Sequence, residues 1–365
     1  MIKNGLIRSR NIKNVNGLDI HFIDTRVRKK KNNSIILLHG FPELSYSFRH
    51  LMYLLAKKGY YCVAPDQRGF GKTISKKKNT LSKFNVLNLT KDVYEFAKKI
   101  NIVKFHLVGH DFGSYVCSYF AILYPNSLYS LTIMSMPFSG PITNKNLYKL
   151  DKLNKELNKL KPKKKHYQYY FSSKNANANI MNCEQGLKNF FRAYFHFKSY
   201  DYRLNKPFVL KSFSAKEVSK MPEYYIMKYN LGISQTVKNY MPSVEEIKNC
   251  SWLKNKDLEY YVKNFKIRGI KEPLKWYKAM LSNKENLKII ELKLPDSINI
   301  PSIFIAGEAD WGIYQKPREL KKMETKFFSN YFGTKIIKEA GHWVQQEKPK
   351  ETYNCIINLI KSIGY

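Results

Sequence analysis

Short apolar runs and amphipathic segments alternate along the first third of the chain. The continuous apolar runs cover residues 34–38, 61–65, 105–108 and 131–135. Runs of this length are typical of strands buried on both faces of a parallel sheet. Amphipathic segments at about 46–58 and 87–100 lie between them, and two alternating stretches flank Asn16-Gly17, a favoured hairpin turn. The pattern predicts a hairpin followed by strand–helix units in one sheet.

The alternation stops after the fourth run and returns near the end of the chain. Between the two regions there is no β-alternating run, and helical patterns rich in aromatic residues and lysine dominate. Strand-like runs reappear at 300–307 and 334–338, and a helical pattern at 352–363 closes the chain. A separate C-terminal domain is not favoured, because about 80 residues with two strands make a thin core. We therefore predict a sheet domain in two parts, 1–137 and 287–365, interrupted by a helical insertion, 138–286.

The third apolar run leads into the sequence VGHDFGS, residues 108–114, and a helical pattern follows until Pro125. A strand, a Gly-x-nucleophile-x-Gly turn and a helix make up a nucleophile elbow. Asp111 occupies the position where such a turn usually carries serine. Asp is also a favoured helix N-cap, which is the simpler interpretation. The glycines on both sides, Gly109 and Gly113, favour the elbow because a Cβ there would crowd the strand and helix.

An aspartate at this position changes the chemistry. With a reference pKa of about 3.9 it is ionised near neutrality, so it needs no base to attack. It can displace a leaving group from a saturated carbon, and water must then hydrolyse the resulting ester. Asp310 follows the strand at 300–307, and His342 lies in a loop after the next strand. Either residue alone could be a loop cap or a surface histidine, but the order Asp111, Asp310, His342 is that of nucleophile, acid and base. His342 would activate the water and Asp310 would orient it.

The charge of the chain is strongly positive: 64 Lys and Arg against 28 Asp and Glu give a formal net charge of +36. A polyanion partner, either nucleic acid or an anionic membrane, would be one explanation. The lysines are dispersed and no nucleic-acid motif accompanies them, so we favour a compositional bias. We expect a small-molecule partner and no nucleic acid, with weak association to anionic membranes left open, as is the oligomeric state.

The spacing of the cysteines and the length of the apolar segments indicate the cellular compartment in which the protein is expected. The five cysteines are far apart and form no CxxC or Cys/His spacing, which predicts neither a zinc site nor a disulfide framework. No bound cofactor is expected. The first residues lack the apolar core of a signal peptide, and the most apolar stretch, 105–124, contains the elbow rather than a membrane span. We expect a cytoplasmic protein, with export through an unrecognised signal left open.

Several motifs together resemble those of the soluble epoxide hydrolases of the α/β-hydrolase superfamily. They are HGFPE (39–43), DQRGFGKT (66–73), VGHDFGS (108–114), HYQYYF (166–171), LEYYVKNFKIRGIKEPLKWY (258–277), GEAD (307–310) and GHWVQQEKP (341–349). The resemblance implies the α/β-hydrolase fold, a mostly parallel eight-stranded sheet flanked by helices with an inserted helical cap domain. It also implies hydrolysis of epoxides to vicinal diols, on lipophilic substrates among which epoxy fatty acids are candidates.

The resemblance further implies roles for individual residues. Two cap tyrosines of the family donate to the epoxide oxygen, and they match Tyr167 and Tyr277. The backbone N–H groups of Phe41 and Phe112 match the oxyanion hole. The matched positions around the substrate pocket are His39, Pro42, Trp276 and Trp343, and the family has a cis peptide at the proline. His110 matches a residue before the nucleophile that we assign to packing.

The chain departs from the family pattern at Phe112, where relatives usually have Trp, and in a longer lysine-rich linker between Met136 and Tyr167. A haloalkane or haloacid dehalogenase on the same fold is the nearest alternative. Such enzymes usually hold halide with Asn after His-Gly and Trp after the nucleophile, whereas this chain has Phe41 and Phe112. The other alternative is a non-catalytic ligand-binding protein on a hydrolase fold. A serine esterase is excluded if Asp111 is the elbow residue.

Overall fold

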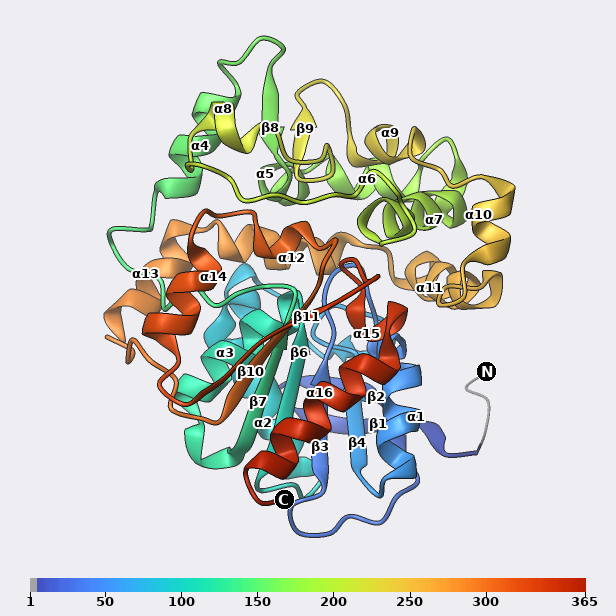
Figure 1. Cartoon of the computed structure of the whole chain (residues 1–365), viewed down its shortest axis with the longest axis vertical. Helices are drawn as coiled ribbons and strands as arrows, with labels where there is room; N and C mark the ends of the chain where they lie inside the picture. The colour runs from blue at the N-terminus through green and yellow to red at the C-terminus, as the bar shows by residue number, and fades with distance from the viewer. Residues whose placement is uncertain (1–4) are drawn as a thin grey trace.

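A twisted sheet forms the centre of the molecule (Figure 1). The computed structural model describes residues 5–365. The first four residues, part of the N-terminal stretch without a signal-peptide pattern, lie outside the described residues. The sheet runs in the order β1-β2-β4-β3-β6-β7-β10-β11, and the short β5 pairs with β2. The strands are β1 (Ile7–Val15), β2 (Leu18–Thr25), β3 (Ser34–Leu38), β4 (Tyr61–Pro65), β5 (Ile74–Ser75), β6 (Phe105–His110), β7 (Leu128–Met134), β10 (Ser302–Gly307) and β11 (Tyr331–Ile337).

The pairing from β4 to β11 is parallel, while β1, β2 and β5 add antiparallel pairs at one edge. Eight strands form the continuous order, so the predicted eight-stranded, mostly parallel sheet is confirmed; β5 lies beside it. Successive side chains of β3 enter different clusters: Ile35 and Leu37 pack on one face, Ile36 and Leu38 on the other. Both faces are thus buried, which explains why the strand has a continuous apolar sequence.

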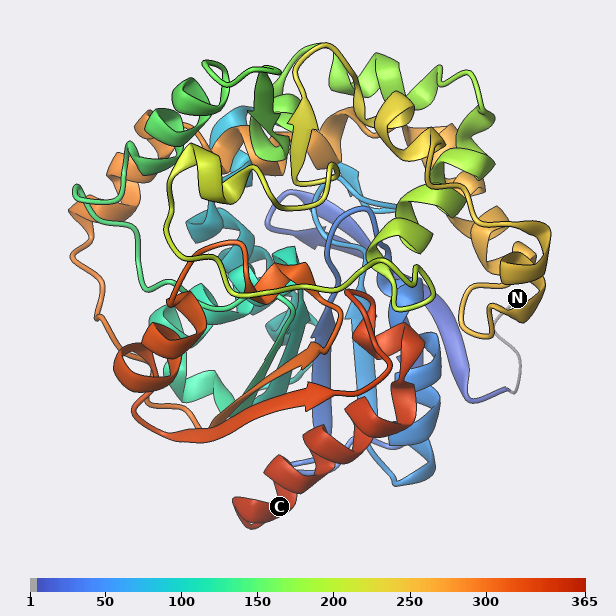
Figure 2. The same cartoon turned by 45° about the horizontal axis from the view of Figure 1, so that its top comes forward.

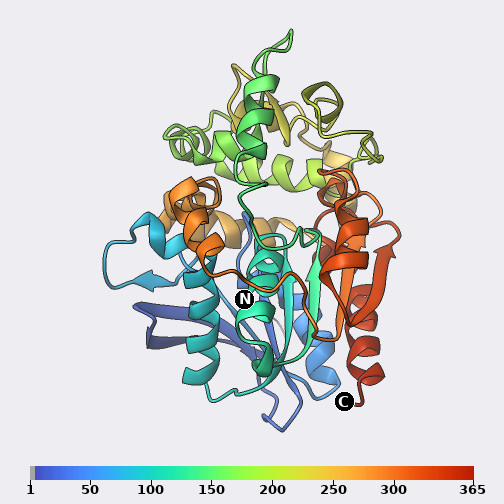
Figure 3. The ribbon, with the colours of Figure 1, turned by 90° about the vertical axis from the view of Figure 1, so that its left-hand side faces the viewer.

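Helices cover both faces of the sheet (Figure 3). On one face lie α1 (Arg49–Lys57) and α16 (Pro349–Ser362), and on the other α2 (Val86–Lys99) and α3 (Phe112–Leu123). The predicted helix at 46–58 is split, because Ser45–Phe48 form a 3-10 turn before α1. Further short elements are the 3-10 turns Leu81–Phe84, Pro125–Ser127 and Trp311–Ile313, the π-turn Met323–Phe327, α14 (Glu319–Lys322) and α15 (Val344–Glu347).

Most of the segment between β7 and β10, here called the cap, lies over the carboxyl ends of the parallel strands, while α13 near its end lies at the side of the sheet (Figure 1). Its helices are α4 (Lys149–Leu157), α5 (Tyr167–Ser172), α6 (Ala176–Met181), α7 (Gly186–Lys198), α8 (Ala215–Val218), α9 (Ile233–Lys238), α10 (Val244–Asn249), α11 (Asn255–Arg268), α12 (Lys271–Met280) and α13 (Asn283–Glu291). The predicted domain boundaries at 138 and 286 stay a prediction.

The cap also contains a small sheet, so the expectation that this segment lacks strands was wrong. β8 (Lys164–His166) pairs antiparallel with β9 (Ile226–Lys228) (Figure 2). Each strand has only three residues, too few to produce a recognisable period in the sequence. The pair fixes the start of α5, because the Tyr167 N–H donates to the Tyr225 carbonyl over 2.8 Å.

Across residues 5–365 no helix is long and apolar enough to cross a membrane. All five cysteines are free thiols. In the same part of the chain, no group of three or more His, Cys, Asp and Glu side chains is arranged to hold a metal ion.

Candidate active site

Asp111 lies in the sharp turn between β6 and α3, the strand–turn–helix arrangement expected from the sequence. Its backbone has φ 53° and ψ −118°, a conformation that a residue with a Cβ adopts only under constraint. The side chain makes no capping hydrogen bond to α3, so the N-cap interpretation is not supported. A Cβ on Gly113 would collide with the Leu38 carbonyl oxygen, which explains the glycine after the nucleophile position.

The carboxylate of Asp111 has two different environments. Its Oδ1 accepts a hydrogen bond from the Phe41 N–H over 3.0 Å, and its Oδ2 lies 3.7 Å from His342 Nε2. Gly40 permits the first contact, because a Cβ there would collide with the Asp111 side chain. The Phe41–Pro42 peptide is cis. Phe112, the other residue predicted to contribute an N–H donor, follows Asp111 directly and begins α3.

Asp310 and His342 form a buried pair beside this carboxylate. His342 Nδ1 is 3.0 Å from Asp310 Oδ1, which also accepts the Gly312 N–H over 2.7 Å. Burial, assisted by the nearby charge of Lys198, lowers the pKa of His342 and favours the neutral imidazole. A neutral ring that donates from Nδ1 leaves Nε2 as an acceptor, and Nε2 has no partner among the described residues.

The two predicted cap tyrosines face the same site from α5 and α12. The ring centroids of Tyr167 and Tyr277 are 5.9 Å apart, and the Tyr277 ring is 4.7 Å from that of Phe112. Burial, with Asp111 as the next cause, raises the pKa of Tyr167 above its ordinary value of 10.0. Burial also raises the pKa of Tyr277 well above that value. Both phenols therefore keep their protons at neutral pH and can donate hydrogen bonds.

The remaining predicted pocket residues are tied to the backbone around the site. His39 Nδ1 contacts the Gly40 carbonyl at 2.9 Å, and the Gln67 N–H donates to His39 Nε2 over 3.1 Å. The indole N–H of Trp276 donates to the Arg68 carbonyl, and that of Trp343 donates to the Phe195 carbonyl. Both indoles touch the site with their rings: Trp276 stacks on Phe112, and Trp343 packs edge-on against His342.

Sequence reasoning missed a buried hydrogen-bond network beneath the loop that carries His342. Glu43 contacts His110 Nδ1 at 2.7 Å and accepts from the Gln345 and Gln346 amides over 2.9 and 2.8 Å. His110 Nε2 in turn lies 2.7 Å from the His342 carbonyl oxygen. His110, assigned to packing, thus links Glu43 to the loop that carries His342. The signal was present, since Glu43 ends HGFPE and both glutamines belong to GHWVQQEKP.

Lys198, the last residue of α7, was also missed, because it belongs to no motif. Its carbonyl accepts the His342 N–H over 2.9 Å, so the cap contacts the histidine loop directly. Its side chain is buried and its charge acts on His342.

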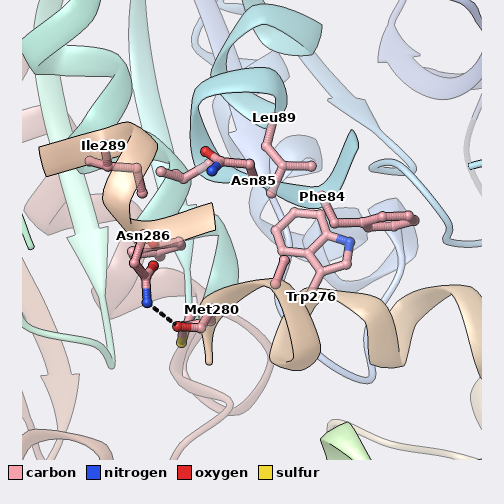
Figure 4. Close-up of a pocket in the computed structure, with 10 residues that line it drawn as sticks. Phe84, Asn85, Leu89, Trp276, Met280, Asn286 and Ile289 are labelled. Atoms are coloured by element: carbon pink, nitrogen blue, oxygen red, sulfur yellow. Dashed lines mark hydrogen bonds between the residues drawn. The ribbon is translucent and has the colours of Figure 1, made fainter. Parts of the chain in front are cut away.

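A small recess lies behind the site, between α2, α12 and α13 (Figure 4). Residues that line it include Phe84, Asn85, Leu89, Trp276, Met280, Asn286 and Ile289. Trp276 lines this recess and also stacks on Phe112. The Asn286 amide donates to the Met280 carbonyl over 3.0 Å, as Figure 4 shows. The recess belongs to the packing between cap and core.

The sheet order, the elbow and the overlying helices define the α/β hydrolase class. The sequence model of the alpha/beta hydrolase fold matches residues 33–349, and the chain belongs to that family. The chain is 26% identical over 353 residues to epoxide hydrolase B of Mycobacterium tuberculosis, which covers 96% of this chain and 97% of the relative. It is 25% identical over 349 residues to bifunctional epoxide hydrolase 2 of Sus scrofa, covering 95% of this chain and 54% of that protein.

Comparison with solved structures identifies the same group of proteins. Potato (Solanum tuberosum) epoxide hydrolase I superposes with a TM-score of 0.75 at 26% sequence identity, covering 98% of this chain and 99% of the other. The predicted fold class and the predicted resemblance to epoxide hydrolases are both confirmed.

Proposed function

We propose that this protein hydrolyses epoxides to vicinal diols through a covalent ester on Asp111. The family match and the full-length relatives make it an enzyme of the epoxide hydrolase class. One observation carries the mechanism: the Asp111 carboxylate lies beside His342 Nε2, which has no hydrogen-bond partner among the described residues, and its charge acts on the protonated phenols of Tyr167 and Tyr277.

In the first step, Asp111 Oδ2 attacks a ring carbon of the epoxide and the carbon–oxygen bond of that carbon breaks. Oδ2 is the attacking atom because Oδ1 is held by the Phe41 N–H. The departing oxygen gains negative charge, and Tyr167 or Tyr277 donates a proton to it. A preorganised donor of this kind stabilises the charge where it develops. The product is a hydroxyalkyl ester of Asp111.

In the second step, His342 Nε2 takes a proton from a water molecule that attacks the ester carbonyl carbon. Asp310 stabilises the resulting imidazolium. The oxyanion forms on Oδ1, where the Phe41 N–H already donates and the Phe112 N–H is the second proposed donor. The intermediate then collapses and its alkoxy oxygen takes the proton from His342. The other water proton replaces the one that the tyrosine gave, so water and epoxide give a diol and restore the enzyme.

The alternative dehalogenase activity is less well supported by the residues around Asp111. Halide binding usually needs an indole or amide N–H directed at the leaving atom. The indole N–H groups of Trp276 and Trp343 are both committed to backbone carbonyls, and Phe112 has none. The two phenols instead suit an oxygen that stays attached to the product.

The substrate and the setting of the reaction are also proposals. Aromatic side chains of the cap crowd the site, with Phe171 stacked on Tyr277 at 4.9 Å, which suits a lipophilic epoxide. Residues 138–286 are the proposed cap domain, and a cytoplasmic location is the proposed setting. Association with anionic membranes can be measured by co-sedimentation with anionic and neutral liposomes.

The test of the function is turnover of a panel that runs from styrene oxide to epoxy fatty acids, read by mass spectrometry of the diols. Diols should form from several members, and a chelator should leave the rates unchanged. The Asp111→Asn variant is the control, because a carboxamide lacks the attacking oxyanion. Faster release of halide from haloalkanes than of diol from epoxides would contradict the proposal.

A further inference from the structure

Lys198 has a buried ammonium group surrounded by aromatic rings. Only 4% of the residue is exposed. Its Nζ lies 5.1 Å from the ring centroid of Trp343, and 5.6, 5.7 and 5.4 Å from those of Tyr194, Tyr224 and Tyr225. These four rings are called the lysine cage. A cation within about 6 Å of an aromatic face is attracted by the ring quadrupole.

The four aromatic rings alone do not compensate for the solvation that the buried ammonium group loses. Within residues 5–365, the carboxylates of Asp111, Asp310 and Glu43 act on Lys198 through their charge alone and form no hydrogen bond with its Nζ. A desolvated cation–π contact recovers only a fraction of the solvation free energy that an ammonium loses when it is removed from water. Burial accordingly lowers the pKa of Lys198, although Asp111, Asp310 and Glu43 oppose that effect. The group lacks a direct anionic partner.

The lysine cage shares its walls with the candidate active site. Trp343 lies 4.6 Å from the His342 ring, and Tyr225 lies 5.0 Å from the Tyr167 ring, both between centroids. Trp343 therefore contacts both Lys198 and the proposed base His342, and Tyr225 contacts both Lys198 and the proposed proton donor Tyr167. The Lys198 carbonyl also holds the His342 N–H, which fixes the cation relative to the catalytic histidine.

We propose that Lys198 is the counter-ion for an anionic group carried by the substrate, so that the preferred epoxides bear a carboxylate a few bonds from the ring. This inference rests on the proposed epoxide hydrolysis and specifies its substrate class. A carboxylate that enters the lysine cage would supply the ion pair that the ammonium lacks, and hydrogen bonds to charged groups are the stronger ones.

The competing explanation is that Lys198 only balances the charges of Asp111, Asp310 and Glu43. In that case its removal would change the turnover of charged and neutral epoxides by the same factor. A carboxylate site predicts a difference between the two, because only the acid loses its partner. Discrimination between matched substrates therefore separates the explanations.

The experiment compares 3-phenylglycidate with its primary amide, which has the same skeleton and no charge. The wild-type enzyme should prefer the acid in kcat/KM. Lys198→Met should lower the ratio of kcat/KM for the acid to kcat/KM for the amide by roughly 10-fold to 150-fold, the worth of a hydrogen bond to a charged group, because any effect of the lost charge on His342 acts on both substrates alike. Lys104→Met is the matched control. Its ammonium also lies over a ring, that of Tyr129 at 4.9 Å, but at the opposite end of β6 from Asp111.

A binding measurement separates failure of this inference from failure of the proposed function. Titration calorimetry should show tighter binding of 3-phenylpropionate than of its amide, and Lys198→Met should remove the difference. Equal losses for acid and amide, or no preference for the acid in turnover and binding, would overturn the carboxylate site even if styrene oxide is hydrolysed. Absence of any epoxide turnover would overturn the proposed function, while the calorimetry would still decide whether Lys198 binds a carboxylate.

Discussion

His342 Nε2 lies 3.7 Å from Asp111 Oδ2, close enough to act on the same reacting group but too far for a direct hydrogen bond. The aspartate is therefore not held by the histidine, in contrast with a serine nucleophile, which depends on its base. An ionised carboxylate can attack without help, and the histidine is left free to activate water. This separation of the two residues is what the proposed two-step mechanism requires.

Replacing His342 with Gln should stop the reaction after its first step. Epoxide should be consumed about once per enzyme molecule, and the mass of the intact protein should rise by that of the substrate. Peptide mapping should place the adduct on Asp111. The Asp111→Asn protein should show neither adduct nor turnover, and repeated turnover by His342→Gln would contradict the two-step mechanism.

Tyr167 and Tyr277 are proposed to donate to the same oxygen, so their loss should be partly redundant. Each single Phe substitution should lower kcat by roughly 10-fold to 1000-fold, and the double substitution should nearly abolish ring opening. Because burial raises the pKa of both phenols above 10.0, the wild type should lose no activity to their ionisation below pH 10. Circular dichroism should show an intact fold, and an active double variant would remove both tyrosines from the mechanism.

The acid limb of the pH profile should reflect His342. Its neutral form is the base, and burial followed by the charge of Lys198 lowers its pKa below 6.5. The base therefore stays available to a lower pH than that of an ordinary histidine, and the midpoint of the acid limb of kcat should lie below 6.5. Rates of ester hydrolysis measured between pH 4 and 8 on pre-formed adduct would isolate this step. A midpoint at or above 6.5 would contradict the assigned environment.

Much of the fold was predictable because each strand of the parallel sheet can be recognised from its own short stretch of sequence. The apolar runs that became β3, β4, β6 and β7 are buried on both faces, so each strand is visible in the sequence by itself. The positions of Asp111, Asp310 and His342 followed from the same regularity, since each comes after a strand of one parallel sheet. Parallel strands present their carboxyl ends at one edge, and the structure brings the three side chains together there.

The features that were missed depend on contacts between distant parts of the chain. Glu43 meets Gln345 and Gln346 across some 300 residues, and the two motifs that contain them do not indicate that these side chains touch. Lys198 is one of many lysines in a chain of net charge +36, and only its burial among four aromatic rings distinguishes it. The strands β8 and β9 are held by each other rather than by their own propensity. All three features depend on tertiary packing, which the local sequence does not reveal.

The buried Glu43–His110 pair should stabilise the protein most strongly in a defined pH window. Burial alone would raise the pKa of Glu43, but the charge of His110 and its hydrogen bond lower it below 4.5 overall. Burial alone would likewise lower the pKa of His110, but Glu43 raises it above 6.5. The contribution of Glu43 is present above pH 4.5 and is lost as the pH falls through its folded pKa. The contribution of His110 is present below pH 6.5 and is lost as the pH rises through its folded pKa.

Glu43→Gln should therefore destabilise the protein most between pH 4.5 and 6.5 and less at pH 9. Breaking a buried pair by removing one partner lowers the free energy of unfolding by about 3 to 5 kcal/mol, or roughly 4 to 7 °C in Tm for a chain of this length. The matched control is Glu156→Gln, which breaks the exposed Glu156–Lys159 pair and should change Tm by less than about 2 °C. Thermal melts of the three proteins across this pH range test the prediction. A Tm difference for Glu43→Gln that grows steadily towards pH 9 would mean that His110 is not the charged partner of Glu43.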